Sequence, residues 1–103
     1  MKHTDKMLFV CVENAGRSQM AEALAKKLGL STMSAGTLPA TAVNPVVAAV
    51  MKERGIDISA NHPKTLTMQM VNEVDLVVTS CLLLSDYVHY FVHHVQGLEV
   101  LVS

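Results

Sequence analysis

Cysteine and aromatic residues are scarce in this sequence of 103 residues, which contains two cysteines, two phenylalanines, two tyrosines and no tryptophan. Two cysteines far apart in the chain do not form the disulfide framework of a small secreted domain, so a reducing, cytoplasmic location is expected. Because aromatic rings are so few, the core has to be built from Val, Leu, Ala and Met.

A strong charge of either sign is also missing, since eight Lys and Arg and nine Asp and Glu give a formal net charge of −1. Without a basic run, nothing in the charge pattern predicts nucleic acid or a membrane surface as a partner. No apolar run reaches the length of a membrane span, and the N-terminus has no signal-peptide pattern. The length predicts one domain over residues 1–103.

Apolar runs of strand length alternate with segments of helical periodicity along the chain. The expected strands lie at 7–10, 32–35, 76–79 and 98–102. The expected helices lie at 17–28, from 45 to just before the glycine at 55, at 66–71 and at 85–95. Their expected apolar faces are Met20, Ala21, Leu24, Ala25 and Leu28 on the first helix, and Val46, Val47, Val50 and Met51 on the second. This alternation predicts an α/β fold with a parallel sheet and helices on both faces.

The stretch from Cys11 to Ser18 carries the most specific chemical pattern. A buried strand ends in Cys11, a short loop with Asn14 and Gly16 follows, and Arg17 and Ser18 open a helical pattern. Five residues between the cysteine and the arginine let the chain curl around one tetrahedral anion, with backbone N–H groups pointing inward. The alternative, a strand-end cysteine beside a surface arginine, accounts less well for the strand, glycine and helix around them.

Each part of this loop has a role in holding an anion. The N-terminus of the following helix adds free donors and a partial positive charge, which favours the thiolate form of Cys11. The planar fork of Arg17 can bind two oxygens of one anion. A thiolate below the anion and donors around it suit in-line attack on phosphorus or arsenic. The residues expected to bind the anion are Val12, Glu13, Asn14, Ala15, Gly16 and Arg17.

These residues resemble the phosphate loop of the low-molecular-weight protein tyrosine phosphatases and their arsenate-reductase branch. Cys11, Asn14, Arg17 and Ser18 match that loop. The following Gln19-Met20-Ala21-Glu22 is more similar to the reductases, because the phosphatases usually have proline after the loop serine. Further matches, which extend the resemblance over residues 7–81, are Ser34-Ala35-Gly36, Asn44-Pro45, Gly55-Ile56-Asp57-Ile58-Ser59 and the run from Asp75 to Cys81.

The resemblance implies a three-layer fold whose four-stranded parallel sheet has the order 2-1-3-4. For the reductase branch it also implies a chemistry, in which Cys11 attacks arsenate and Cys81 then attacks the sulfur of Cys11. Arsenite leaves and a disulfide remains, which an external thiol such as thioredoxin would reduce. The alternative for Cys81 is an inert buried thiol. No bound cofactor and no metal are expected, only phosphate, sulfate or arsenate in the loop.

Two departures from the family pattern keep other functions open. The segment 82–86 has no third cysteine to carry the disulfide outward, and the family's general-acid Asp and terminal helix are expected to be absent from these 103 residues. The first departure counts against the redox cycle, and the second counts against phosphoester hydrolysis and so favours the reductase branch. A phosphatase acting on phosphotyrosine or small aryl phosphates is the first alternative, because aryl leaving groups need less help from an acid. A non-catalytic phosphate-binding domain is the second. A sheet face without its terminal helix also predicts self-association to a homodimer.

Several residues around the loop are expected to support it. Ser18 is expected to donate its hydroxyl to Cys11, and Asn14 either braces the loop through its side chain or only permits a left-handed backbone. Glu22 and Ser34 match positions that brace the loop in the reductase branch, where some members bind an alkali cation. We expect the ammonium of Lys64 to replace that cation. His89, His93 and His94 share a helix face without a third ligand type, so a metal site is not predicted.

Overall fold

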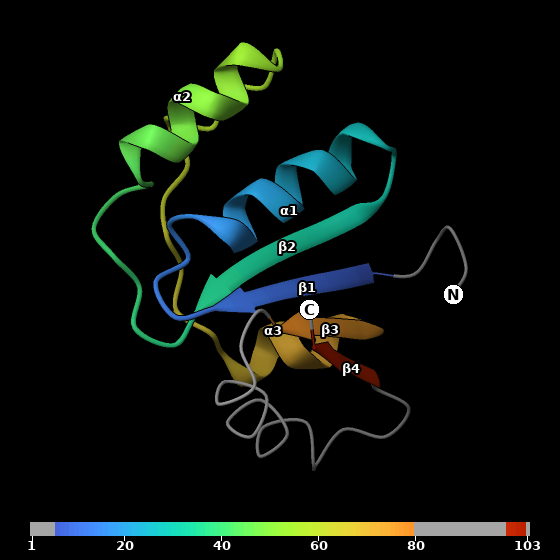
Figure 1. Cartoon of the computed structure of the whole chain (residues 1–103). Coiled ribbons are helices and arrows are strands. Elements are labelled where there is room, and N and C mark those ends of the chain that lie inside the picture. Colours follow the sequence, from blue (N-terminus) through green and yellow to red (C-terminus); the bar gives the residue numbers. More distant parts are fainter. Residues whose placement is uncertain (1–5, 80–98, 103) are drawn as a thin grey trace.

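The computed structural model describes residues 6–79 and 99–102 (Figure 1). Within them, the elements in chain order are β1 (Lys6–Cys11), α1 (Arg17–Lys27), β2 (Ser31–Gly36), α2 (Pro45–Glu53), α3 (Met68–Glu73), β3 (Leu76–Thr79) and β4 (Glu99–Val102). The strands form one parallel sheet in the order β2-β1-β3-β4, which confirms the predicted α/β class and strand order. The predicted helix at 85–95, its three histidines and Cys81 lie outside the described residues.

The register of the sheet brings the carboxyl ends of its central strands to one edge. Cys11, the last residue of β1, pairs with Gly36 at the end of β2. On the other side of β1, Val10 pairs with Thr79 at the end of β3. In open parallel sheets ligands bind at this edge, where the strand order reverses. The loop that follows Cys11 therefore starts at the position where a binding site is expected.

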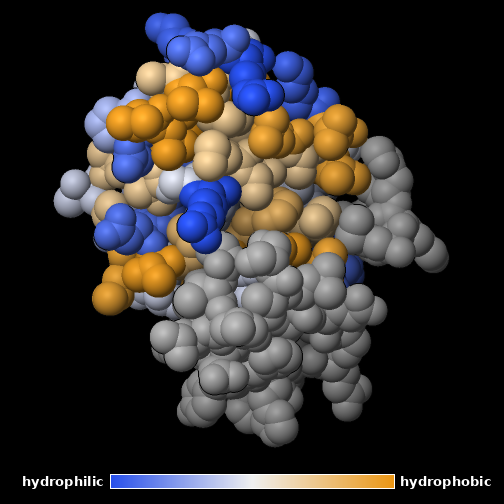
Figure 2. All heavy atoms as spheres, in the orientation of Figure 1, coloured by the Kyte–Doolittle hydropathy of each residue, from blue (hydrophilic) through white to orange (hydrophobic). Residues whose placement is uncertain are grey.

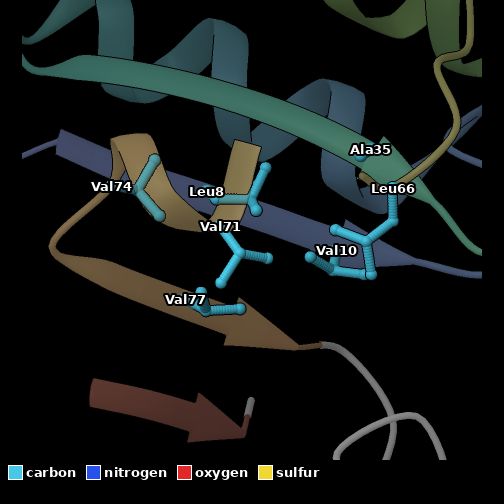
Figure 3. Packing of buried hydrophobic residues seen from close by; sticks show 7 residues of the cluster. All are labelled: Leu8, Val10, Ala35, Leu66, Val71, Val74 and Val77. Carbon is cyan, nitrogen blue, oxygen red and sulfur yellow. The ribbon is translucent and has the colours of Figure 1, made fainter. Parts of the chain in front are cut away.

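One face of the sheet is covered by α3 through a cluster of small aliphatic side chains (Figure 3). Alternate residues of a strand face opposite sides, and Leu8 and Val10 of β1 point toward Val71 of α3. Burial of each such side chain contributes about 1.5–3 kcal/mol. The other members of the cluster are Ala35, Leu66, Val74 and Val77.

The start of α3 differs from the sequence prediction, which placed this helix at 66–71. Thr67 is the N-cap, since its side-chain oxygen accepts a hydrogen bond from the backbone N–H of Met70 at 3.2 Å. The preceding Leu66 instead donates its backbone N–H to the carbonyl of Gly36 at 2.8 Å. This bond ties the residue to the end of β2, so the helix begins two residues later.

On the other face of the sheet, α1 buries a largely polar side (Figure 1). Its buried residues are Ser18, Gln19, Glu22 and Ala25. The prediction that Leu24 and Leu28 face inward was wrong, because their exposed fractions are 43% and 75%. The inward positions are instead taken by side chains that hydrogen-bond beneath the loop after Cys11.

The remaining helix, α2, packs on the outer side of α1 and begins at a cap that the sequence predicts. The side chain of Asn44 accepts a hydrogen bond from the N–H of Val46 at 2.9 Å, and Pro45 takes the first helical position. Met51 is buried against Val43 and Ile58, with Met20 of α1 packed on the same cluster.

The inward orientation predicted for Val46 and Val50 was wrong. Their exposed fractions are 70% and 40%. Met51 is the buried residue of α2, and these valines lie outside that contact. Figure 2 shows hydrophobic and hydrophilic side chains side by side on the described part of this face. No helix within the described ranges is long and apolar enough to cross a membrane.

Candidate active site

The loop between β1 and α1 turns all of its carbonyl groups outward. Each carbonyl from Cys11 to Gly16 accepts a hydrogen bond from a residue beyond the loop, at 2.8–3.2 Å. The donors, in the order of the carbonyls, are the backbone N–H groups of Thr37, Leu38 and Ala40, the side-chain Nε2 of Gln19, and the backbone N–H groups of Asn44 and Met20. Because C=O and N–H point opposite ways in a planar trans peptide, the N–H groups of residues 12–17 face the loop interior.

The sulfur of Cys11 lies at the base of this loop and forms two hydrogen bonds. Ser18 Oγ lies 2.8 Å from Cys11 Sγ, and the backbone N–H of Asn14 donates to the same sulfur at 3.1 Å. Asn14 Nδ2 donates to Ser18 Oγ at 2.8 Å and fills one of its two acceptor sites, and the serine's own hydrogen is available to a Cys11 thiolate. Cys11 is a half-buried free thiol. Two donors on one sulfur are the arrangement that a thiolate accepts.

Asn14 combines the two properties that the sequence left as alternatives. Its φ of 51° is left-handed, and its side chain is fully buried. Its Nδ2 donates to Ser18 and to Ser34 Oγ, the second at 2.9 Å. Its Oδ1 accepts from the backbone N–H of Lys64 at 2.8 Å and from Gln19 Nε2 at 3.2 Å. The amide is therefore saturated, and it joins the loop to β2, α1 and the segment before α3.

A buried carboxylate extends this network beneath the sheet edge. Ser34 Oγ donates to Glu22 Oε1 at 2.5 Å, and Lys26 Nζ lies 2.8 Å from Glu22 Oε2. The cation paired with Glu22 is therefore Lys26. The expectation that the Lys64 ammonium takes this place was wrong, because Lys64 reaches the network through its backbone N–H. In the described part of the chain, the Lys64 ammonium forms no hydrogen bond or ion pair.

Two residues on the rim of the loop carry charge. Arg17 is exposed at the start of α1 and, among the residues described, has no hydrogen-bond or ion-pair partner. Its guanidinium is free to bind oxygens of an anion in the loop. Glu13 is exposed and likewise forms no ion pair within the described ranges. Arg17 and Ser18 also line a cavity of about 160 Å³, together with Phe9, Val10, Ala21, Val78 and Thr79.

The sequence prediction assigned no role in the site to three residues that shape it, Gly36, Gln19 and Asn61. A side-chain carbon at Gly36 would lie 2.6 Å from the carbonyl oxygen of Val12, so only glycine lets β2 end this close to the loop. Gln19 holds the carbonyl of Asn14, and Asn61 Nδ2 donates to Gln19 Oε1 at 3.2 Å. Apolar spacing carried no signal for this role, because it assigns a glutamine at this position to the surface.

The fold and the loop together define a class, an α/β protein with a cysteine-based oxyanion loop at the end of its first strand. The model of the low molecular weight phosphotyrosine protein phosphatase family matches residues 6–95, and the chain belongs to that family.

Known proteins similar to the chain include arsenate reductases. An arsenate reductase of Brevibacillus brevis is 43% identical over 84 residues, which cover 79% of this chain and 62% of that protein. A glutaredoxin arsenate reductase of Synechocystis sp. is 39% identical over 79 residues, covering 74% and 60%.

Among solved structures, a Corynebacterium glutamicum thioredoxin-dependent arsenate reductase matches with a TM-score of 0.79 and 34% identity, covering 97% of this chain and 49% of that one. The chain thus spans about three fifths of the two curated relatives' length and about half of the solved chain.

Proposed function

We propose that this chain is an arsenate reductase in which Cys11 is the nucleophile. One observation carries the proposal: the loop carbonyls all turn outward around a sulfur that forms hydrogen bonds with Ser18 and with the Asn14 N–H. An anion in the loop would meet backbone donors around it and the cysteine beneath it. The kind of oxyanion is inferred from the relatives, whose names include arsenate reductase.

The first step forms a bond between Cys11 and arsenic. Arsenate binds to the N–H groups of residues 12–17, and Arg17 holds two of its oxygens. The Cys11 thiolate attacks arsenic, and one As–O bond breaks. The departing oxygen takes up protons and leaves as water. The intermediate is an arsenic(V) thioester of Cys11, and no electron has yet been transferred.

The second step transfers two electrons to arsenic. The thiolate of Cys81 attacks Cys11 Sγ, a disulfide forms, and the As–S bonding pair remains on arsenic. Arsenite leaves with arsenic reduced from the +5 to the +3 state. An external thiol then reduces the disulfide, and thioredoxin or glutaredoxin is the proposed class of reductant because relatives are named for both. A reducing, cytoplasmic location suits a working thiol of this kind.

Thiol counting by mass spectrometry after arsenate treatment tests the proposal. The wild-type chain is expected to lose both free thiols and release one arsenite per chain. Cys81→Ser is expected to release none, and Cys11→Ser is the matched variant that blocks the first step. Wild-type thiols that stay free in the presence of arsenate would contradict the reductase function.

A low-molecular-weight phosphatase is the alternative, favoured by the family to which the chain belongs. Cys11 would then form a phosphocysteine that water hydrolyses, and Cys81 would not be needed. Hydrolysis of p-nitrophenyl phosphate that is lost in Cys11→Ser but kept in Cys81→Ser would support this function. Phosphate binding without either reaction would instead indicate a non-catalytic oxyanion-binding domain. Self-association to a homodimer stays a prediction, and light scattering over a range of concentrations tests it.

A further inference from the structure

We propose that Gln19 is a positioning residue that keeps the peptide between Asn14 and Ala15 in its anion-binding orientation. The inference rests on the proposed oxyanion function and adds a residue that determines whether the loop can bind. Gln19 lies on α1 with its side chain fully buried. It is not itself expected to contact the anion or the sulfur.

The argument starts from how each loop carbonyl is held. Backbone N–H groups hold five of the six carbonyls from Cys11 to Gly16, and no side-chain substitution removes those donors. The carbonyl of Asn14 is held instead by a side chain, through Gln19 Nε2 at 3.1 Å. The orientation of this one peptide therefore depends on the identity of a single side chain.

The peptide after Asn14 loses its outer partner when Gln19 is replaced. In the described part of the chain, Gln19 Nε2 is the donor that holds the carbonyl of Asn14 on the outer side of the loop. A rotation of this peptide would swing the Asn14 carbonyl into the loop. The N–H of Ala15 would then point outward, because the two groups are opposite in a trans peptide. An anion would meet a carbonyl oxygen in place of a donor.

Gln19 is placed to prevent this rotation, and its own orientation is set by Asn61. Gln19 Nε2 donates to both Asn14 O and Asn14 Oδ1, at 3.1 and 3.2 Å. Its Oε1 accepts from Asn61 Nδ2 at 3.2 Å, which directs the NH₂ end of the amide toward Asn14. Asn61 is exposed, so a surface residue sets the direction of a buried amide that holds the loop.

Two variants separate this role from simple packing. Gln19→Met keeps an unbranched side chain of similar size but removes both donors to Asn14. Asn61→Asp changes an exposed residue and leaves α1 intact, but its carboxylate attracts the NH₂ end of Gln19 away from Asn14. Val71→Ala, in the cluster between α3 and the sheet, lowers stability without removing a hydrogen bond of the loop and serves as the matched control.

The measurement is the affinity for inorganic phosphate by isothermal titration calorimetry, together with the ¹⁵N shift of the Ala15 amide. Gln19→Met is expected to weaken phosphate binding by about 10- to 100-fold, because one donor to a charged ligand is lost and an acceptor takes its place. Asn61→Asp is expected to weaken it in the same direction by a smaller factor, and the Ala15 shift on phosphate addition is expected to shrink in both. Val71→Ala is expected to lower the melting temperature and leave the affinity within two-fold.

Phosphate affinity unchanged in Asn61→Asp and in a folded Gln19→Met would overturn the inference. So would a loss of affinity in Val71→Ala equal to that in Gln19→Met, since the effect would then follow from stability alone. The proposed function fails separately: an absence of arsenate reduction with the expected loss of phosphate binding would reject the reductase and keep the role of Gln19.

Discussion

The hydroxyl oxygen of Ser18 lies 2.8 Å from the sulfur of Cys11 while it accepts a hydrogen bond from Asn14 Nδ2 at the same length. The asparagine therefore occupies one of the two acceptor sites of the serine oxygen. The serine's own hydrogen is available for donation to the Cys11 sulfur in its thiolate form. Replacement of either polar side chain is expected to alter the other's contact with Cys11.

Ser18→Ala removes the side-chain donor to the sulfur. We expect alkylation of Cys11 by iodoacetamide at pH 6 to slow by about 10-fold, because a hydrogen bond to a charged group contributes about 1.5–3 kcal/mol. The measurement is the alkylation rate by mass spectrometry. Ser31→Ala, at the exposed start of β2, is the control and is expected to have no effect. An equal rate in wild type and Ser18→Ala would contradict a role for the hydroxyl.

Two substitutions at Asn14 separate the effect of its side-chain hydrogen bonds from the effect of its left-handed backbone conformation. Asn14→Ala loses the four side-chain hydrogen bonds and must place a Cβ at a φ of 51°, whereas Asn14→Gly loses the same bonds without that strain. We expect both variants to unfold at lower urea concentration, with alanine less stable than glycine by about 1 kcal/mol. If glycine matched wild type, the side-chain hydrogen bonds would contribute nothing to stability.

Gly36→Ala places a side-chain carbon 2.6 Å from the carbonyl oxygen of Val12 and 2.9 Å from the backbone nitrogen of Asn14. Both of these atoms belong to the loop backbone, so the loop must shift. We expect the free energy of unfolding to fall by about 1–3 kcal/mol and phosphate affinity to fall with it. Gly55→Ala is the matched control, because its φ of 82° is strained but no atom lies within 4 Å. It should lose stability and keep the affinity.

The turn after α2 gives a pH-dependent contribution to stability. The hydroxyl of Ser59, at 2.6 Å, and then its backbone N–H, at 3.0 Å, donate to Asp57 Oδ1 and hold the pKa of this carboxyl below its usual value. Because the folded-state pKa lies below the unfolded one of about 3.9, the ionised Asp57 stabilises the fold above about pH 4. The stabilisation is lost as the pH falls through the folded-state pKa.

Asp57→Asn is therefore expected to lower the melting temperature slightly at pH 7. The difference from wild type should shrink as the pH falls through the folded-state pKa of Asp57, because the wild-type carboxyl is then protonated as well. Thermal unfolding followed by circular dichroism at several pH values checks this. A difference that stayed constant down to the lowest pH would assign the effect to something other than the charge of Asp57.

The strand order and the loop after β1 could be predicted because their signals are local or carried by the family resemblance. Apolar runs mark the strands, and the pattern from Cys11 to Ser18 marks the loop. The inward side of α1 could not be predicted from apolar spacing, because Glu22 and Gln19 are buried by partners from distant segments. Periodicity assigns polar residues to the surface, and only the fold brings Ser34 and Asn61 to meet them.

The sequence prediction correctly placed Lys64 beside this network, but it assigned the contact to the wrong group of the residue. Sequence reasoning assigned its ammonium to the network, but the backbone N–H makes the contact with Asn14 Oδ1. A backbone N–H is present in every residue except proline, so the residue type carries no signal for this bond. The pairing of Lys26 with Glu22 follows the ordinary spacing of four residues along a helix and was available from the sequence.

The bond between the N–H of Asn44 and the carbonyl of Ala15 connects the loop to the start of α2. This amide lies outside the loop, yet its exchange with solvent deuterium requires the contact with Ala15 to open. An anion that tightens the loop would therefore protect a backbone hydrogen almost thirty residues further along the chain. Asn44 thus offers a native spectroscopic reporter of whether the loop is filled, with no label placed near Cys11.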